Sequence, residues 1–364
     1  MINCAELKNF GPIEQLDWQN LGKINLVIGN NGCGKSFLLK ALYSAVRTLE
    51  DYKRGDNPDN VDDILRSKLY WTFQAEKIAD LVANFSRGRE LGKLSFSLIL
   101  NEQKFSYELS EKFTKNFSTL ENKVTPRSEN SIFLPAKEIL SFHHIIDASR
   151  EINKLFGFDD TYFDLTKALK QIPLPVIQEI SWDNSVAVLN NSNYSSIRGR
   201  NYFDFNNARI KIRAMIGGEM EFDDAKKRWY FKKGEQRFPM GVTAEGNRKV
   251  AVLDNLLGNG YLSESSIIFM DEPESTLHPQ YISELLDIIA ILANHGIQFF
   301  IASHSYFVIK KLFLIAQEQQ MSIPVLSYQN NEWVQSDLKD NLPDNPIIDE
   351  SIKLYEQQLD LSDI

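Results

Sequence analysis

The sequence has few cysteines, no long apolar run and no excess of positive charge. Its 364 residues include only Cys4 and Cys33, so the disulfide framework of small secreted domains is excluded. No stretch approaches the roughly 20 apolar residues that span a bilayer. The first ten residues, MINCAELKNF, lack the basic region and apolar run of a signal peptide. We therefore expect a cytosolic (cytoplasmic) protein with no membrane partner.

The charge balance limits the range of partners. With 40 basic and 49 acidic residues, the formal charge of -9 disfavours a chain that coats nucleic acid along its whole surface, although a local basic patch is compatible with it. The chain is longer than the roughly 250–300 residues at which a single core stops growing. We expect a folded core that carries an inserted lobe.

Residues 29–36, GNNGCGKS, match the phosphate-binding pattern G-x-x-x-x-G-K-[ST]. The apolar run 21–28 predicts a buried strand before them, and apolar residues at helical spacing follow in 37–46. Glycines at a helix start let backbone N–H groups surround phosphate oxygens. Lys35 is predicted to contact the β- and γ-phosphates of ATP, and Ser36 to bind Mg²⁺. The predicted ATP-binding residues are Gly29, Asn30, Asn31, Gly32, Cys33, Gly34, Lys35 and Ser36.

Two later apolar runs end in polar residues. The first, 266–270, leads to Asp271 and Glu272, and the second, 297–302, leads to Ser303 and His304. We predict that Asp271 binds Mg²⁺ and that the catalytic Glu272 orients or deprotonates the attacking water. His304 can hydrogen-bond the γ-phosphate. Such residues are also common at ordinary strand ends, and the upstream phosphate loop favours the catalytic interpretation.

Strands that alternate with helices at both ends of the chain indicate an α/β core with a mainly parallel sheet. The middle has mixed signals, with strand candidates at 93–100, 131–134, 219–222 and 228–231. We predict a discontinuous ATPase core of residues 1–50 and 241–335. Residues 51–240 are predicted to form an inserted lobe and antiparallel strands, and residues 336–364 a polar tail.

The order of these motifs resembles the ATP-binding-cassette (ABC) ATPases, specifically the soluble branch with the SMC and RecF proteins. Residues 7–11, LKNFG, look like the first strand of that branch. Residues 243–249 (TAEGNRK), 271–279 (DEPESTLHP) and 133–138 (FLPAKE) are similar to segments of stand-alone AAA-like ATPases related to OLD proteins. The resemblance implies a P-loop NTPase fold of the ABC ATPase head type, in which helices flank a mixed sheet and a helical and β lobe is inserted.

The resemblance also implies a homodimer or higher oligomer that holds ATP between its subunits. The signature of one subunit closes over the ATP of the other, and a second segment forms an interface loop. The implied signature residues are Thr243, Ala244, Glu245 and Gly246, and the implied loop residues are Ser275, Thr276, Leu277 and His278. The usual signature has a serine before its glycines, a place that Ala244 takes here and that Thr243, one residue displaced, could fill. The family's Mg²⁺-contacting glutamine has no assigned counterpart, with Gln74 as an alternative.

The resulting hypothesis is an ATPase that acts as an ATP-gated dimeric switch or sensor for a separate effector protein. Resemblance alone suggests anti-phage or anti-plasmid defence. The roughly 60 residues after His304 leave little room for the Toprim nuclease domain of OLD proteins, so we expect any effector activity to lie elsewhere. The alternative is a DNA-repair or DNA-end-binding ATPase of the RecF/SMC kind, with DNA bound by the basic and aromatic residues of 226–237. Those residues equally fit a hairpin with its charges in water. The interpretation that the sequence supports least is the ATPase motor of a membrane transporter.

Overall fold

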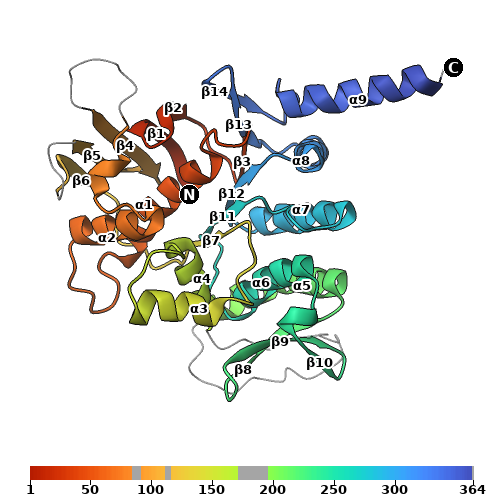
Figure 1. Cartoon of the computed structure of the whole chain (residues 1–364), viewed down its shortest axis with the longest axis horizontal. Coiled ribbons are helices and arrows are strands. Elements are labelled where there is room, and N and C mark those ends of the chain that lie inside the picture. The colour runs from red at the N-terminus through yellow and green to blue at the C-terminus, as the bar shows by residue number, and fades with distance from the viewer. Residues whose placement is uncertain (84–91, 111–115, 171–195, 363–364) are drawn as a thin grey trace.

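The computed structural model describes residues 1–83, 92–110, 116–170 and 196–362. These residues form three β-sheets with helices between and beside them (Figure 1). In this part of the chain, no helix has both the length and the apolar character needed to cross a membrane.

The central sheet has six strands in the order β14-β13-β3-β12-β11-β7. All neighbours pair in parallel except the edge strand β14, which is antiparallel to β13. The predicted mixed sheet is therefore confirmed. Its strands are β3 (Ile24–Ile28), β7 (Ile132–Leu134), β11 (Ile267–Asp271), β12 (Gln298–Ser303), β13 (Pro324–Gln329) and β14 (Glu332–Asp337).

One face of the central sheet is covered by α1 (Lys35–Asp51). Beyond α1 lies a five-stranded antiparallel sheet, and α2 (Val61–Phe73) packs beside α1. Phe133, Phe269 and Phe300 lie on neighbouring central strands and stack in a row toward α1. The antiparallel sheet contains β2 (Ile13–Trp18), β1 (Ile2–Phe10), β4 (Lys93–Leu100), β5 (Gln103–Ser110) and β6 (Thr119–Asn122).

Helices form a second hydrophobic core against the opposite face of the central sheet. Alternate strand residues such as Ile268 and Ile301 point into it, because successive side chains of a strand face opposite sides. The helices are α4 (Asp160–Leu169), α5 (Ser196–Ile216), α6 (Glu245–Gly258), α7 (Pro279–Asn294) and α8 (Tyr306–Gln319).

The remaining elements lie at the periphery. A three-stranded sheet, β10-β9-β8, packs near α6, and helix α9 extends away from the body (Figure 1). They are β8 (Glu219–Asp223), β9 (Arg228–Lys233), β10 (Gln236–Pro239), α3 (His143–Asp147), α9 (Pro346–Ser362), and the single turns η1 (Ile78–Leu81), η2 (Ala148–Ile152) and η3 (Met240–Val242).

The predicted domain boundaries cut across these sheets. Strand β7, from the predicted inserted lobe, pairs with β11 in the central sheet, and β4 pairs with β1. The predicted polar tail contains the whole of α9, a helix that we did not predict from the sequence. The division into a core and an inserted lobe stays a prediction.

Candidate functional site

The phosphate loop connects the end of β3 to the start of α1. Gly29, Gly32 and Gly34 have φ angles of 153°, 83° and 99°, which side chains disfavour. A Cβ atom on Gly29 would lie 2.9 Å from the Sγ of Cys33 and 2.9 Å from the Cβ of Tyr328. Backbone conformation and close packing therefore both require glycine at position 29.

Lys35 and Ser36 begin α1 and point to different partners. Lys35 is 6% exposed, and its Nζ donates hydrogen bonds to the carbonyl oxygens of Gly29 (2.7 Å) and Asn30 (3.1 Å). The hydroxyl of Ser36 donates to Oδ1 of Asp271 at 2.8 Å. The structure thus brings together Ser36 and Asp271, the two residues predicted to hold Mg²⁺, although they are distant in the sequence.

The oxygen pair of Ser36 and Asp271 fits a hard divalent cation. Mg²⁺ prefers oxygen ligands and is usually held by few protein groups together with phosphate and water. Burial raises the pKa of Asp271, the Ser36 hydrogen bond opposes this, and nearby Glu272 adds to it. A cation beside the carboxylate would offset this cost. Within the described ranges, no cluster of three His, Cys, Asp or Glu side chains could hold a metal by itself.

Glu272 and His304 lie in contact at the carboxyl ends of β11 and β12. Oε1 of Glu272 is 3.0 Å from Nδ1 of His304, and both side chains are accessible, with exposures of 30% and 49%. Glu272 has a φ of 46°, and its N–H donates to the carbonyl of Ala302 at 2.9 Å. Such strained backbone in a non-glycine residue is typical of functional sites. The arrangement leaves the Glu272 carboxylate able to reach a water molecule.

Glu274 hydrogen-bonds the segment that carries His304, and we did not assign it a catalytic role from the sequence. It is 9% exposed, and its Oε1 accepts hydrogen bonds from the Ser303 hydroxyl (2.6 Å) and the His304 N–H (3.3 Å). It therefore fixes the segment that carries His304. The only sequence signal is its place in the acidic run 271–274.

Lys249 of α6 joins three segments around the site. Its Nζ donates to the carbonyl oxygens of Ala136 (3.0 Å) and Glu272 (2.5 Å) and to the hydroxyl of Ser275 (2.7 Å). Burial lowers the pKa of Lys249 to about 8, although the acids Glu274, Asp271 and Glu272 oppose the shift. Sequence reasoning placed Lys249 in the signature segment without a role. The sequence signal that could have identified Lys249 is a lysine on the buried side of α6.

The signature segment packs against the predicted interface loop of its own chain. A Cβ atom on Gly246 would lie 2.8 Å from the carbonyl oxygen of Thr276 and 2.9 Å from Cδ2 of Leu277. Ala244 caps α6 without a side-chain hydrogen bond, and the Thr243 hydroxyl donates to the carbonyl of Pro239 at 3.3 Å. The two predicted segments therefore form one surface. Their contact with a second subunit stays a prediction.

The other loop residues have structural partners. The Ser275 hydroxyl donates to the carbonyl of Ala136 at 2.8 Å, and His278 is the N-cap of α7, where its Nδ1 accepts the N–H of Gln280 at 3.3 Å. Gln74 ends α2, and its amide oxygen accepts the N–H groups of Gly157 and Asp159 at 3.1 and 3.2 Å. Gln74 thus holds the loop before α4, and the glutamine role stays unassigned.

Known proteins resemble this chain in sequence and in fold. Residues 24–310 match the protein family described as "AAA domain, putative AbiEii toxin, Type IV TA system". An uncharacterized protein of Methanocaldococcus jannaschii is 32% identical over 93 residues, which are 25% of this chain and 40% of that protein. This alignment therefore spans less than half the length of that relative.

The structure is also similar to SMC head domains. The SMC head bound to the C-winged helix domain of ScpA superposes with a TM-score of 0.50 at 13% identity, covering 93% of this chain and 98% of that one. The head with an extended coiled coil, bound to the C-terminal domain of ScpA from Pyrococcus furiosus, gives 0.49 at 10% identity and covers 98% of both chains. The SMC head domain from Thermotoga maritima gives 0.45 at 12% identity, covering 92% and 98%. The first likeness establishes the ATPase-head fold.

Proposed function

The chain belongs to the AAA-domain family that matches residues 24–310, and from this premise we propose that it binds ATP with Mg²⁺ and hydrolyses it as a dimeric switch for a separate effector. One observation carries the ATPase proposal. Ser36, Asp271, Glu272 and His304 follow or end three neighbouring parallel strands of the central sheet, and they meet in two contacts of 2.8 and 3.0 Å. Ligands bind at this edge in open α/β sheets.

Each residue has a proposed role. The N–H groups of residues 29–36 surround the phosphates, and Lys35 exchanges its loop carbonyl partners for phosphate oxygens. Ser36 and Asp271 hold Mg²⁺, which supplies charge neutralisation on the phosphates. Glu272 accepts a proton from the attacking water, and His304 hydrogen-bonds the γ-phosphate. Lys249 and Glu274 hold the backbone of Glu272 and His304 in place.

The proposed dimer places the signature of one subunit over the ATP of the other. Its support is one exposed apolar side chain close in sequence to each half of the site. Val242, directly before the signature, is 72% exposed, and Phe307, three residues after His304, is 56% exposed. Ala244, Glu245, Thr276 and His278 are also exposed and available to a second subunit.

The effector proposal rests on the family. Its description names a toxin and a type IV toxin–antitoxin system, which fits a defence role for this chain. We propose that the ATP-bound dimer regulates a separate protein in defence against phage or plasmids.

Replacing Glu272 with glutamine tests the ATPase mechanism. Glu272→Gln should retain ATP binding, lower turnover by roughly 10²- to 10⁴-fold because the water loses its base, and accumulate as an ATP-bound dimer. Phosphate release, nucleotide binding and mass measured by light scattering report these effects. Glu318→Gln, an exposed position on α8, is the matched control and should turn over at the wild-type rate. Wild-type turnover in Glu272→Gln would remove Glu272 from the mechanism.

The DNA-binding alternative depends on the hairpin of β8 and β9, whose basic residues have acidic neighbours. Lys232 lies 3.7 Å from Glu219, and Arg237 lies 3.2 Å from Glu221. These ion pairs favour the alternative interpretation, in which the charged side chains of the hairpin face water. Stimulation of ATP turnover by DNA, lost on charge reversal of Lys226, Lys227 and Lys232, would instead favour DNA repair.

A further inference from the structure

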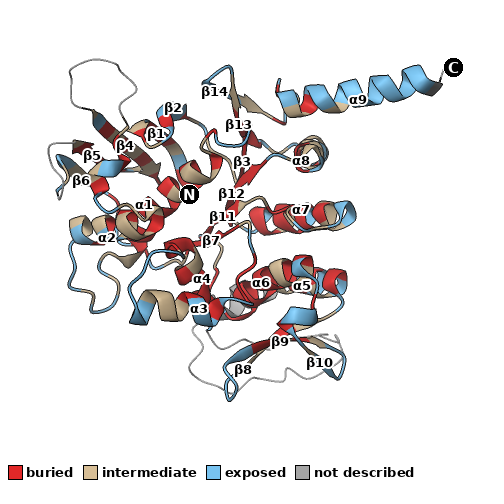
Figure 2. Cartoon of the chain, in the orientation of Figure 1, coloured by how far each residue is buried: buried red, intermediate tan, exposed pale blue. Residues whose placement is uncertain are grey.

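Helix α6 joins the predicted signature to the turn that carries Glu272. Residues 244 and 245, at the start of the helix, are exposed, whereas residues 250–258 are buried (Figure 2). Lys249 lies between these two parts of α6, and its Nζ bonds to the carbonyl oxygen of Glu272 at 2.5 Å. The exposed end of α6 is therefore connected to the proposed active site by a side chain about one turn along the helix.

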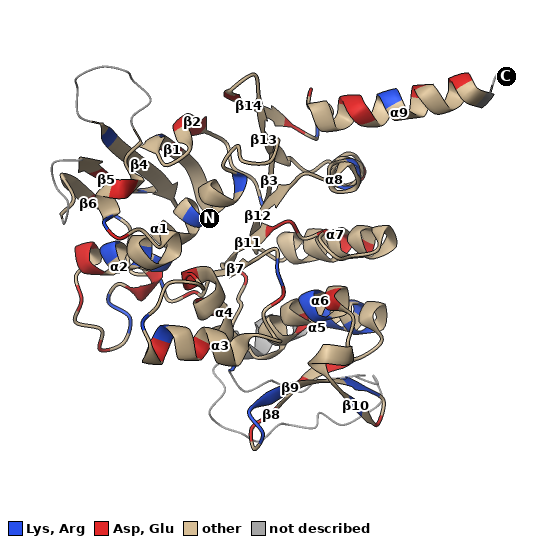
Figure 3. Cartoon of the chain, in the orientation of Figure 1, with Lys and Arg blue, Asp and Glu red and all other residues tan. Residues whose placement is uncertain are grey.

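The ammonium of Lys249 has all three of its N–H donors in use. It donates to the carbonyl oxygens of Ala136 and Glu272 and to the Ser275 hydroxyl, and that hydroxyl donates in turn to the Ala136 carbonyl at 2.8 Å. Among the nearby acids, Glu274 in the segment after β11 attracts the charge most (Figure 3). One buried cation thus holds together α6, the residues after β7 and the residues after β11.

The carbonyl that Lys249 holds belongs to the strained residue of the turn. Glu272 has a φ of 46°, a conformation that a residue with a side chain disfavours. Its carbonyl oxygen accepts hydrogen bonds from Lys249 and from the Ser275 N–H (3.0 Å). Hydrogen bonds from a charged donor are roughly twice as strong as those between neutral groups. Lys249 is therefore the stronger of the two partners that keep the Glu272 peptide in this conformation.

Close packing connects α6 to the same turn at a second point. A Cβ atom on Gly246 would lie 2.8 Å from the carbonyl oxygen of Thr276 and 2.9 Å from Cδ2 of Leu277. Because no free space separates these groups, the start of α6 cannot approach the loop without displacing it. The position of α6 and the position of residues 272–277 are therefore linked by packing as well as by the Lys249 hydrogen bonds.

We propose that Lys249 is a positioning residue that makes the alignment of Glu272, and hence ATP turnover, depend on the position of α6. In the proposed dimer, phosphates held by the partner subunit attract the N-terminus of α6. Lys249 passes the resulting shift to the Glu272 peptide. This inference rests on the proposed function of the site and adds a means by which dimer formation controls it.

Replacing Lys249 with methionine removes the charge and keeps an unbranched side chain. Lys249→Met should bind ATP within about threefold of the wild-type affinity, because its hydrogen-bond partners lie outside residues 29–36. Its kcat should fall roughly 10- to 100-fold, because Glu272 is misplaced. Nucleotide titration and phosphate release measure the two values. Lys211→Met, at an exposed position on α5, is the matched control and should keep both.

Lys249→Arg distinguishes the charge from packing. The arginine keeps a cation beside the carbonyl oxygens, so its kcat should lie between those of the wild type and Lys249→Met. If Lys249 acted through packing alone, the larger arginine would be the more damaging replacement. A kcat of Lys249→Arg at or below that of Lys249→Met, or a wild-type kcat in Lys249→Met, would overturn the proposal.

The dependence of turnover on dimer formation tests the link to α6. Turnover per subunit is measured at protein concentrations below and above those at which light scattering detects the ATP-bound dimer. For the wild type the ratio of the two rates should be at least about fivefold. Lys249→Met should still form the dimer but give a ratio below about twofold, with Lys249→Arg between them. If Lys249→Met does not fold, the ratio in Lys249→Arg decides the question.

The same measurements separate this inference from the proposed function. A wild-type chain without ATP turnover would disprove the proposed function. A wild-type chain whose turnover rises on dimer formation, with an equal rise in the folded Lys249 variants, would leave the proposed function intact and overturn the link. Lys249 would then support Glu272 in the same way whatever the position of α6.

Discussion

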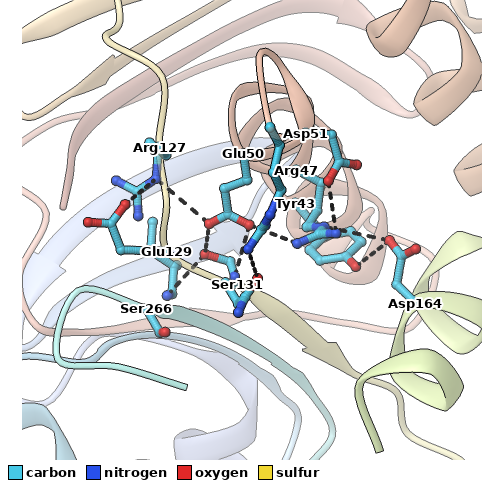
Figure 4. A network of polar contacts seen from close by, with 12 residues as sticks. Tyr43, Arg47, Glu50, Asp51, Arg127, Glu129, Ser131, Asp164 and Ser266 are labelled. Atoms are coloured by element: carbon cyan, nitrogen blue, oxygen red, sulfur yellow. Dashed lines mark hydrogen bonds and ion pairs between the residues drawn. The ribbon is translucent and has the colours of Figure 1, made fainter. Parts of the chain in front are cut away.

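The two ends of helix α1 have opposite environments. At its N-terminal end, Lys35 and Ser36 bond only to groups of the phosphate loop and the end of β11, among the described residues. At its C-terminal end, Arg47, Glu50 and Asp51 belong to a buried network of ion pairs and hydrogen bonds (Figure 4). The residues at the N-terminal end can exchange their hydrogen-bond partners, whereas the residues at the C-terminal end keep theirs.

Glu50 is the centre of one half of this network. It is fully buried and accepts hydrogen bonds from the Ser131 N–H (2.9 Å), the Ser131 hydroxyl (2.6 Å) and Arg47 (3.0 Å). The Ser131 hydroxyl also accepts the N–H of Ile267 at 3.1 Å. Glu50 therefore ties α1 to the residues at which β7 and β11 begin.

Asp164 of α4 is the centre of the other half. It accepts hydrogen bonds from the Tyr43 hydroxyl (2.8 Å) and from Lys68 (3.0 Å), and Arg47 lies 3.7 Å away. Burial by itself raises the pKa of Asp164, but Lys68 and Arg47 outweigh it and bring the pKa to about 2. The network thus keeps a charged carboxylate inside the protein.

The difference follows from the direction of the strands. Parallel strands present their carboxyl ends at one edge, where the proposed nucleotide site lies, and their beginnings at the other edge. The network clamps that second edge. Because the C-terminal end of α1 is fixed, the residues at its N-terminal end stay in position when a ligand replaces their hydrogen-bond partners.

The largest expected loss of stability follows from removing Glu50. Glu50→Ala removes the acceptor of the Ser131 N–H and hydroxyl and one of the carboxylate partners of Arg47, and should lower the free energy of unfolding by about 3–5 kcal/mol. Denaturant titration measures this loss, with the exposed Glu14→Ala as control. A loss below about 1 kcal/mol would show that the C-terminal end of α1 is not a clamp.

A substitution at the N-terminal end of α1 should affect ligand binding more than stability. Lys35→Ala should abolish ATP binding at concentrations that saturate the wild type, a loss of about 2–5 kcal/mol of binding free energy, because the β- and γ-phosphates lose a buried cation. Its free energy of unfolding should change by no more than about 1 kcal/mol, since its partners are loop carbonyls. Calorimetric titration with ATP checks the binding, and the exposed Lys233→Ala is the control. Retained affinity would contradict the phosphate-loop assignment.

The smallest expected effect is on the acid limb of the stability profile, that is, on the decrease in the free energy of unfolding at low pH. The pKa of Asp164 is lower in the folded chain than its ordinary value of 3.8, so its stabilisation is complete above that value and is lost as the pH falls toward about 2. This group should contribute about 2 kcal/mol to the acid dependence. Asp164→Asn should flatten that limb in unfolding experiments at several pH values, whereas the exposed Asp340→Asn should not. An unchanged slope in Asp164→Asn would show that Asp164 is not charged in the folded chain.

The elements nearest the motifs were predicted best from the sequence. Strands β3, β11 and β12 and helix α1 lie close to their predicted ranges, because continuous apolar runs and helical spacing are local signals. Helix α9 was not predicted, since frequent charges made its apolar spacing easy to mistake for a polar tail. The Tyr43–Asp164 and Glu50–Ser131 pairs could not be predicted, because their partners are 121 and 81 residues apart in the sequence.

The sequence by itself determined the chemistry of the phosphate loop, because glycines, a lysine and a serine at fixed spacing act through adjacent backbone atoms. It also determined the layered α/β fold through its apolar periodicity. Only the tertiary structure decided which distant residues meet. The Ser36 hydroxyl reaches Asp271, Lys249 reaches the backbone of Glu272, and α9 projects with Ile352 and Tyr355 exposed. These contacts depend on strand order and helix packing, which no local pattern of residues specifies.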